Sequence, residues 1–321
     1  MADKKKYFLL FLKWIVIISS VSFIAFRIVD SGHVLAENNF FSFSLKSVSL
    51  FLLAFLLVFV NWLVEAFKWK QLLKPYIIID SITAYKGVLV GLSTAIFTPN
   101  RVGEYFGRSL VLKRDNYSVG LIATVTGSIA QILTTVVFGL IAFVFLFSYF
   151  PEMPFRYQNT MVLTLISSII FMVLLLLLYF KIHKFIRFLF GLPFFKKIKQ
   201  FEPELKAYSK EILAKTLFMS FFRYFVFVSQ YLLLLEVFMV EILWYDAIIA
   251  ISAGYFVMLI IPVFTFAEAG LRGAVALFFM EMVSNSTLGI LSSAICLWII
   301  NLAIPALFGT YIISKIKVKN D

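Results

Sequence analysis

Three charged residues interrupt an apolar stretch in the first third of the chain. The segment FTPNRVGEYFGR at 97–108 carries Arg101, Glu104 and Arg108 at spacings i, i+3 and i+7. On a helix this spacing places all three on one face, where Glu104 is expected to pair with either arginine. Arginine binds carboxylate and phosphate groups through two parallel N–H bonds. We therefore expect this segment to hold an anionic group.

A second apolar stretch is interrupted in a similar way. The segment PVFTFAEAGLRG at 262–273 carries Glu268 and Arg272, four residues apart, and Arg223 lies within a third apolar stretch. A charge at the centre of a bilayer costs about 2.5–3.5 kcal/mol on insertion scales, so such residues tend to face a cavity or a partner. The candidate substrate-binding residues are Arg101, Glu104, Arg108, Arg223, Glu268 and Arg272.

Each interruption also contains a signal for the start of a helix. Thr98 precedes Pro99, a residue suited to the first helical position, and Thr265 stands three residues before Glu268 as in a capping box. Unpaired N–H groups at such starts favour an anion, and a phosphate is the natural ligand. The alternative is that the charges neutralise one another and only hold these segments together.

The composition places most of the chain in lipid. Of 321 residues, 62% are hydrophobic and only 14% are charged, whereas soluble domains carry about a quarter. The net charge is +12, but the basic residues flank the apolar runs instead of forming one polar face. We therefore expect no nucleic-acid partner. The sequence has no Gly-rich phosphate loop, metal-ligand cluster or nucleophile elbow, and we expect no cofactor, no metal and no enzymatic activity.

Polar residues elsewhere in the apolar runs are weaker signals. Glu65 lies near the end of an apolar run, within reach of Lys68, and predicts an interfacial salt bridge. Gln131 and Arg223 can bridge helices, and Arg223 is the better candidate for a substrate path.

The hydropathy pattern predicts an all-α polytopic membrane protein with six full transmembrane helices and two re-entrant helical hairpins. Re-entrance of both interrupted stretches leaves only Arg27, Lys46 and Arg156 on one side, which is the positive-inside pattern and puts both termini in the cytoplasm. We expect a multi-pass protein of the bacterial cytoplasmic (inner) membrane. The full spans are expected at 7–29, 47–67, 118–149, 160–180, 213–239 and 287–313, and the hairpins at 83–112 and 245–281.

With this topology the two halves of the chain repeat one plan in opposite orientation. Residues 1–150 form a first membrane repeat with a cytoplasmic-side hairpin, and residues 151–321 form a second with an external-side hairpin. Inverted repeats of this kind are typical of secondary transporters, whose sites lie between the repeats. The basic stretch 181–211 interleaves bulky apolar residues with Lys and Arg, and is expected to lie on the cytoplasmic leaflet or simply to connect the halves.

The sequence resembles the flippase-like transmembrane region of lysylphosphatidylglycerol synthases and its stand-alone relatives. The resemblance rests on three segments in order, NWLVEAFKWKQLL at 61–73, TPNRVGEYFGRSLVLKR at 98–114 and IPVFTFAEAGLRGAVALFF at 261–279. The first hairpin motif of the family falls on Pro99, Arg101, Gly103, Glu104 and Arg108. The second corresponds only loosely, through Pro262, Glu268, Gly270 and Arg272.

The resemblance implies inverted repeats with re-entrant helices and a role in moving lipid between leaflets. It does not imply lysyl transfer, because the soluble aminoacyl transferase domain of the bifunctional members is absent from this sequence. We therefore expect a transporter or flippase of an anionic phospholipid or other lipid-phosphate. An intramembrane lipid-modifying enzyme with Glu104 or Glu268 as base, and an accessory subunit of a lipid or glycolipid synthesis system, remain alternatives. The membrane and the lipid are the expected partners, and homo-oligomerisation is left open.

Overall fold

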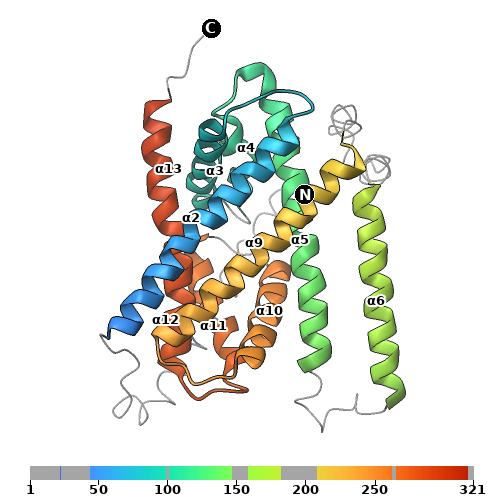
Figure 1. Cartoon of the computed structure of the whole chain (residues 1–321), viewed down its shortest axis with the longest axis vertical. Helices are drawn as coiled ribbons and strands as arrows, with labels where there is room; N and C mark the ends of the chain where they lie inside the picture. Colours follow the sequence, from blue (N-terminus) through green and yellow to red (C-terminus); the bar gives the residue numbers. More distant parts are fainter. Residues whose placement is uncertain are drawn as a thin grey trace, which may run out of the picture.

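The computed structural model describes residues 22, 44–98, 101–146, 158–181, 208–261 and 265–316. These residues form helices joined by turns and contain no strand (Figure 1). Four helical stretches, at 45–73, 114–146, 210–237 and 287–315, are long and apolar enough to cross a membrane. The predicted first span at 7–29 lies outside the described residues except for Ser22, which is helical, and most of the basic stretch 181–211 lies outside them too.

The other predicted full spans are confirmed as helices, with small shifts at their ends. They are α2 (Leu45–Leu73), α5 (Tyr117–Leu146), α6 (Gln158–Phe180), α9 (Lys210–Val237) and a last stretch made of α12 (Thr287–Trp298), η5 (Ile299–Ala303) and α13 (Ile304–Lys315).

Local sequence explains where several of these helices start or change pitch. The Ser44 and Ser209 hydroxyls accept the Ser47 and Ile212 N–H groups at the starts of α2 and α9. The π-helical turn η5 ends just before Pro305, whose missing N–H and bulky ring disfavour an unbroken α-helix.

The first interrupted stretch folds back on itself as α3 (Ser81–Ile96) and the short helix α4 (Gly103–Ser109). The predicted helix start at Pro99 is wrong, because Arg101 adopts a left-handed backbone conformation with φ 57°, which no α-helix running through it allows. The N-cap residue of α4 is Val102, and the Thr98 hydroxyl accepts the N–H of Gly103, the first residue of the helix, at 2.7 Å.

The second interrupted stretch forms α10 (Trp244–Ile260) and α11 (Thr265–Met280), which pack against each other. Helix α11 begins at Thr265, the residue at which the sequence predicted a start. The Thr265 side chain lies outside the described residues, so the capping box stays a prediction.

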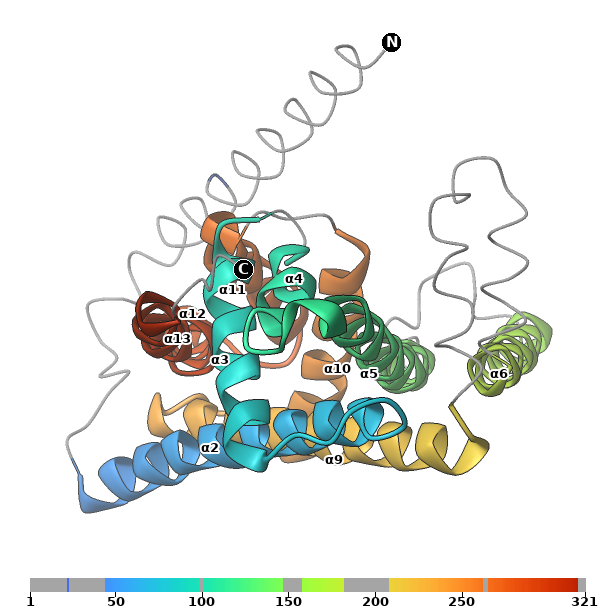
Figure 2. The same cartoon turned by 90° about the horizontal axis from the view of Figure 1, so that it is seen from above.

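The packing brings together helices that are far apart in the sequence. Helix α2 runs antiparallel along α9, as contacts at both ends demonstrate: Lys46 pairs with Glu236, and the Gln71 amide donates to the Ile212 carbonyl. Viewed from above, α13 lies beside α3 and α5 lies beside α10 (Figure 2). Glycines permit both crossings, since a Cβ at Gly309 would overlap the Leu89 backbone and one at Gly139 would overlap Phe256.

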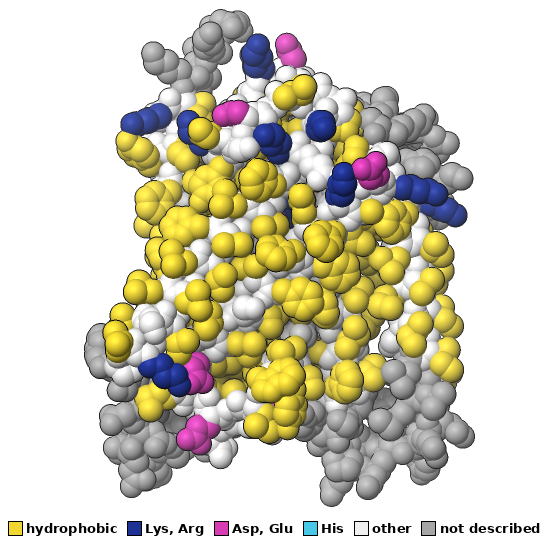
Figure 3. Space-filling view, viewed as in Figure 1, with side chains coloured by type: hydrophobic (Ala, Val, Ile, Leu, Met, Phe, Trp, Pro, Cys, Tyr) yellow, Lys and Arg dark blue, Asp and Glu magenta, His cyan; other side chains and the backbone are white. Residues whose placement is uncertain are grey.

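One face of the molecule carries a broad apolar band with charged residues beyond it (Figure 3). On the face of Figure 3, Lys and Arg gather along the upper edge, where α2 ends and α9 begins. Among the described cations at the helix ends, only Lys46 lies at the opposite end of the molecule; the others are Lys70, Lys74, Lys86, Lys113, Arg114, Lys181, Lys210, Lys215 and Lys315.

A cluster of buried charges at the helix crossings

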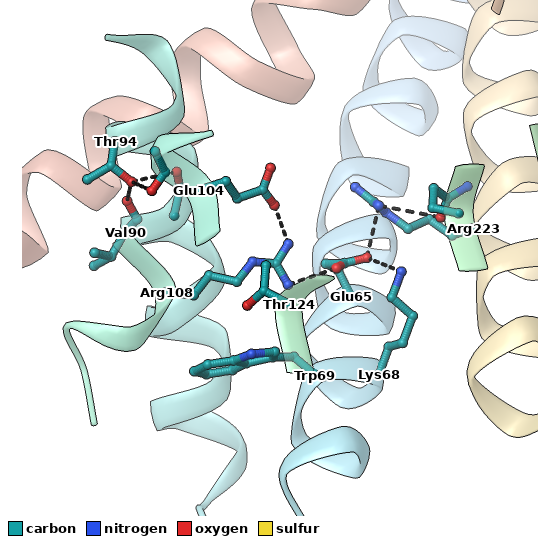
Figure 4. A network of polar contacts seen from close by, with 12 residues as sticks. Glu65, Lys68, Trp69, Val90, Thr94, Glu104, Arg108, Thr124 and Arg223 are labelled. Atoms are coloured by element: carbon teal, nitrogen blue, oxygen red, sulfur yellow. Dashed lines mark hydrogen bonds and ion pairs between the residues drawn. The ribbon is translucent and has the colours of Figure 1, made fainter. Parts of the chain in front are cut away.

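Glu65 of α2 is the centre of a buried ion-pair network. Its carboxylate accepts Lys68 at 2.8 Å, Arg108 at 2.8 Å and Arg223 at 2.9 Å. Arg108 also pairs with Glu104 of the same helix, α4, so it lies between two carboxylates (Figure 4). The side chains of Glu65, Lys68 and Arg108 are each no more than 4% exposed. The network joins α2, α4 and α9 in the interior.

Neutral polar groups extend this network around Arg223. Its Nε donates to the Asn61 Oδ1 at 2.6 Å, and its guanidinium lies over the rings of Trp62 and Phe227. The Asn61 amide in turn donates to Asn301 in η5 at 3.1 Å. The Arg223 side chain is therefore held both by polar groups and by aromatic faces.

A second cluster joins the two interrupted stretches. Glu268 of α11 accepts Arg101 at 2.8 Å from the turn between α3 and α4, and Arg272 at 2.7 Å from its own helix. The Glu268 side chain is 6% exposed, whereas Arg101 and Arg272 are 33% and 24% exposed. Glu268 thus holds two partly accessible arginines with one carboxylate.

The two clusters are neighbours, because Arg223 interacts electrostatically with both Glu104 and Arg101. Together they contain three carboxylates, Glu65, Glu104 and Glu268. These face five cations, Lys68, Arg101, Arg108, Arg223 and Arg272. The two clusters therefore carry a net positive charge, which favours an anionic ligand.

Close packing of α4 against α3 positions Arg108. A Cβ on Gly103 or Gly107 would overlap Thr94 of α3, and one on Gly91 would come within 2.7 Å of Arg108 Cγ. The Thr94 hydroxyl also donates to the Gly103 carbonyl at 2.8 Å. These small residues let α4 lie directly on α3, with Arg108 directed across to Glu65 in α2 (Figure 4).

All six predicted site residues lie in the two clusters, and among their pairings with one another only the partner of Arg101 was not predicted. Glu104 pairs with Arg108 as expected, whereas Arg101 pairs with Glu268, because the left-handed turn at Arg101 directs it toward the second interrupted stretch. Glu268 and Arg272 pair as their spacing predicted. Their role in substrate binding stays a prediction.

The predicted interfacial salt bridge between Glu65 and Lys68 forms, but it is buried in the interior. No further partner of Glu65 was predicted, because Arg108 and Arg223 reach it only through tertiary packing. One signal in the sequence indicated further partners. Asn61, Glu65 and Lys68 lie close together inside an apolar run, and burying such residues is costly unless each is paired.

A small cavity adjoins the second cluster in the part of the chain that the structure describes. Arg272 lines a cavity of about 20 Å³ together with Tyr231, Tyr255 and Met258, which holds about one water molecule and is too small for a phosphate. The described residues contain no group of three His, Cys, Asp or Glu side chains that could hold a metal ion.

Comparison with known protein families identifies the chain. Residues 11–309 match the family described as the lysylphosphatidylglycerol synthase TM region. The chain belongs to this family. The match covers nearly the whole sequence, including both interrupted stretches, and with the apolar helices it establishes a multi-pass membrane protein. Membership in the lysylphosphatidylglycerol synthase TM region family connects the chain to membrane lipids. The same comparisons found no matching curated protein and no matching solved structure.

Proposed function

We propose that this protein moves an anionic phospholipid or other lipid-phosphate between the two leaflets of the membrane. The observation that carries the proposal is the excess of cations in the two clusters, where five cations face three carboxylates. Each of the five cations has a carboxylate partner, but the carboxylates are shared, so the clusters keep an excess of positive charge that favours a negatively charged ligand. Membership in a lipid-related membrane family makes a lipid headgroup the fitting anion.

In this proposal Glu268 occupies the position of the substrate's phosphate when the site is empty. Its carboxylate accepts both Arg101 and Arg272, and a phosphate oxygen binds arginine in the same way. The cavity beside Arg272 is too small for a headgroup, so binding requires the turn at Arg101 to separate from α11. Arg101 and Arg272 would then bind the phosphate in place of Glu268.

The membrane topology is part of the same proposal. We infer that 83–112 and 245–281 are re-entrant hairpins entering from opposite sides, and that the first returns to the cytoplasm. Three contacts support a hairpin at 83–112: Gly91 lies against Arg108, Gly87 lies against Val111, and the Thr94 hydroxyl bonds Gly103. The gathering of Lys and Arg at one end of the helices supports a cytoplasmic position for that end.

The inverted repeat is supported by which helices pack together. If the halves at 1–150 and 151–321 correspond, α2, α3, α4 and α5 match α9, α10, α11 and α12 to α13. The contact of α3 with α13 then corresponds to that of α10 with α5, and the contact of α4 with α5 to that of α11 with α12. The antiparallel course of α2 and α9 fits the opposite orientation that this correspondence requires.

A leaflet assay tests the proposed function. Purified protein is placed in vesicles with fluorescent phosphatidylglycerol, and label in the outer leaflet is quenched to measure exchange between leaflets. We expect the wild type to accelerate exchange and Arg101→Gln to abolish the acceleration at normal abundance. Lys46→Gln, which removes an exposed cation paired with Glu236, serves as the matched control and keeps full activity.

The double variant Arg101→Gln/Glu268→Gln separates binding from structure. If Arg101 only neutralises Glu268, the single variant loses abundance and the double variant recovers both abundance and lipid movement. A substrate-binding Arg101 predicts that movement stays lost in both. A wild-type protein that moves no lipid but changes its headgroup, as detected by mass spectrometry, would instead support the intramembrane enzyme.

A further inference from the structure

A groove opens on the outside of the molecule, apart from the buried charge clusters. It lies between the end of α2 and the start of α9, and its volume is about 900 Å³, in the range of ligand sites. Its walls come from both helices and from the segment 75–79 that follows α2. None of the three carboxylates of the buried clusters lines it.

Each helix supplies the groove with a stripe that changes from aromatic to basic. On α2, Phe67 lies deeper in the molecule, and Lys70 and Lys74 follow toward the end of the helix. Helix α9 runs the opposite way, so its lysine, Lys215, lies near the same end of the molecule, and Phe218 and Phe222 lie deeper. In each stripe the first and last residues are seven positions apart, which is about 10 Å along the helix axis. The groove therefore has a basic end and an apolar floor.

The basic end carries more positive than negative charge. Its three lysines, Lys70, Lys74 and Lys215, face the single carboxylate of Glu211. Lys70 donates to the Ser81 hydroxyl and Lys215 pairs with Glu211, whereas Lys74 makes no side-chain hydrogen bond or ion pair with the described residues. Within the described part of the chain, an anion therefore meets one ammonium group without such a partner and two that are held by exposed partners.

The apolar floor is open to the surroundings. Phe67, Phe218 and Phe222 are 46%, 71% and 47% exposed, although burying such side chains is favourable. They lie on the deep side of the lysines, where the hydrocarbon of a membrane would begin.

We propose that this groove binds one phospholipid with an anionic headgroup, with its phosphate at Lys74 and Lys215 and its acyl chains along Phe67, Phe218 and Phe222. The charge excess selects the headgroup, and the aromatic floor selects an amphiphile over a free phosphate. This site does not depend on lipid movement through the buried clusters.

Lipid retention tests the proposal. The protein is purified from nanodiscs containing equal phosphatidylglycerol and phosphatidylcholine, and retained lipid is counted by native mass spectrometry. We expect the wild type to keep phosphatidylglycerol preferentially, and Lys74→Glu/Lys215→Glu to reduce its retention by about fivefold for each lysine. Lys86→Glu/Lys113→Glu makes the same charge change outside the groove and is expected to leave retention unchanged.

Two cross-linking measurements test whether protein occupies the groove instead of lipid. In a Cys296→Ser background, Phe218→Cys is tested for a disulfide with a second copy and with a cysteine introduced at Phe190. Either cross-link in high yield would overturn the proposal, because a second chain or the segment 182–207 would then fill the groove. Equal retention of the two lipids by the wild type, or equal losses in both double variants, would overturn it as well.

Discussion

Glu65 shows how a single carboxylate can organise a membrane interior. It accepts Lys68, Arg108 and Arg223 from three different helices, at distances of 2.8, 2.8 and 2.9 Å. Burying so many charges is unfavourable unless each keeps its partners. The network is therefore sensitive to the loss of any one member, whereas a pair at the molecular surface is not.

We predict that Glu65→Gln lowers the free energy of unfolding by about 3–5 kcal/mol, because it leaves buried cations without a carboxylate. Thermal unfolding in detergent measures the effect. The control is Glu236→Gln, which breaks an exposed pair with Lys46 (55% and 71% exposed) and is expected to cost about 0–1 kcal/mol. Equal losses in the two variants would contradict the importance of burial.

At the scale of elements, α4 is a helix of seven residues that is held by its fit against α3. Gly103 and Gly107 face Thr94, and the Thr94 and Thr98 hydroxyls bond the backbone of Gly103. Such a short helix is not stable alone, so its position depends on this close contact. Arg101 and Arg108 stand on either side of the contact and depend on it for their positions.

We predict that Gly107→Ala displaces α4 from α3 and reduces lipid movement at least tenfold, because the added methyl group overlaps the Thr94 hydroxyl. Gly270→Ala in α11 is the matched control. A Cβ there meets nothing within 4 Å, and alanine favours a helix by about 1 kcal/mol over glycine. The control variant should match or exceed the wild type in thermal stability and in the leaflet assay.

At the scale of the whole molecule, the two interrupted stretches meet through Arg101 and Glu268, 167 residues apart. If the stretches enter the membrane from opposite sides, this ion pair lies where the two stretches meet in the interior. Separating the stretches toward one side of the membrane or toward the other would then expose the same arginines to each side in turn. Such an arrangement would fit the alternating access of secondary transporters.

We predict that residues 116 and 156 lie on opposite sides of the membrane. Cysteines introduced at Asn116 and Arg156 in a Cys296→Ser background should differ in labelling by an impermeant maleimide in intact cells, with only position 156 labelled. Permeabilised cells provide the control, since both positions should then react. Equal labelling in intact cells would refute re-entrance of the stretch 83–112.

The sequence by itself determined the described spans, the interrupted stretches and the six charged residues, because hydropathy and the cost of buried charge are local properties. It also predicted the pair of Glu268 with Arg272, and it predicted that Glu104 pairs with one of its two neighbouring arginines, which is Arg108 in the structure. Only the tertiary structure decided that Arg101 reaches Glu268 and that Glu65 accepts Arg108 and Arg223. Such pairings depend on a left-handed turn and on helix crossings, which spacing along one helix cannot encode.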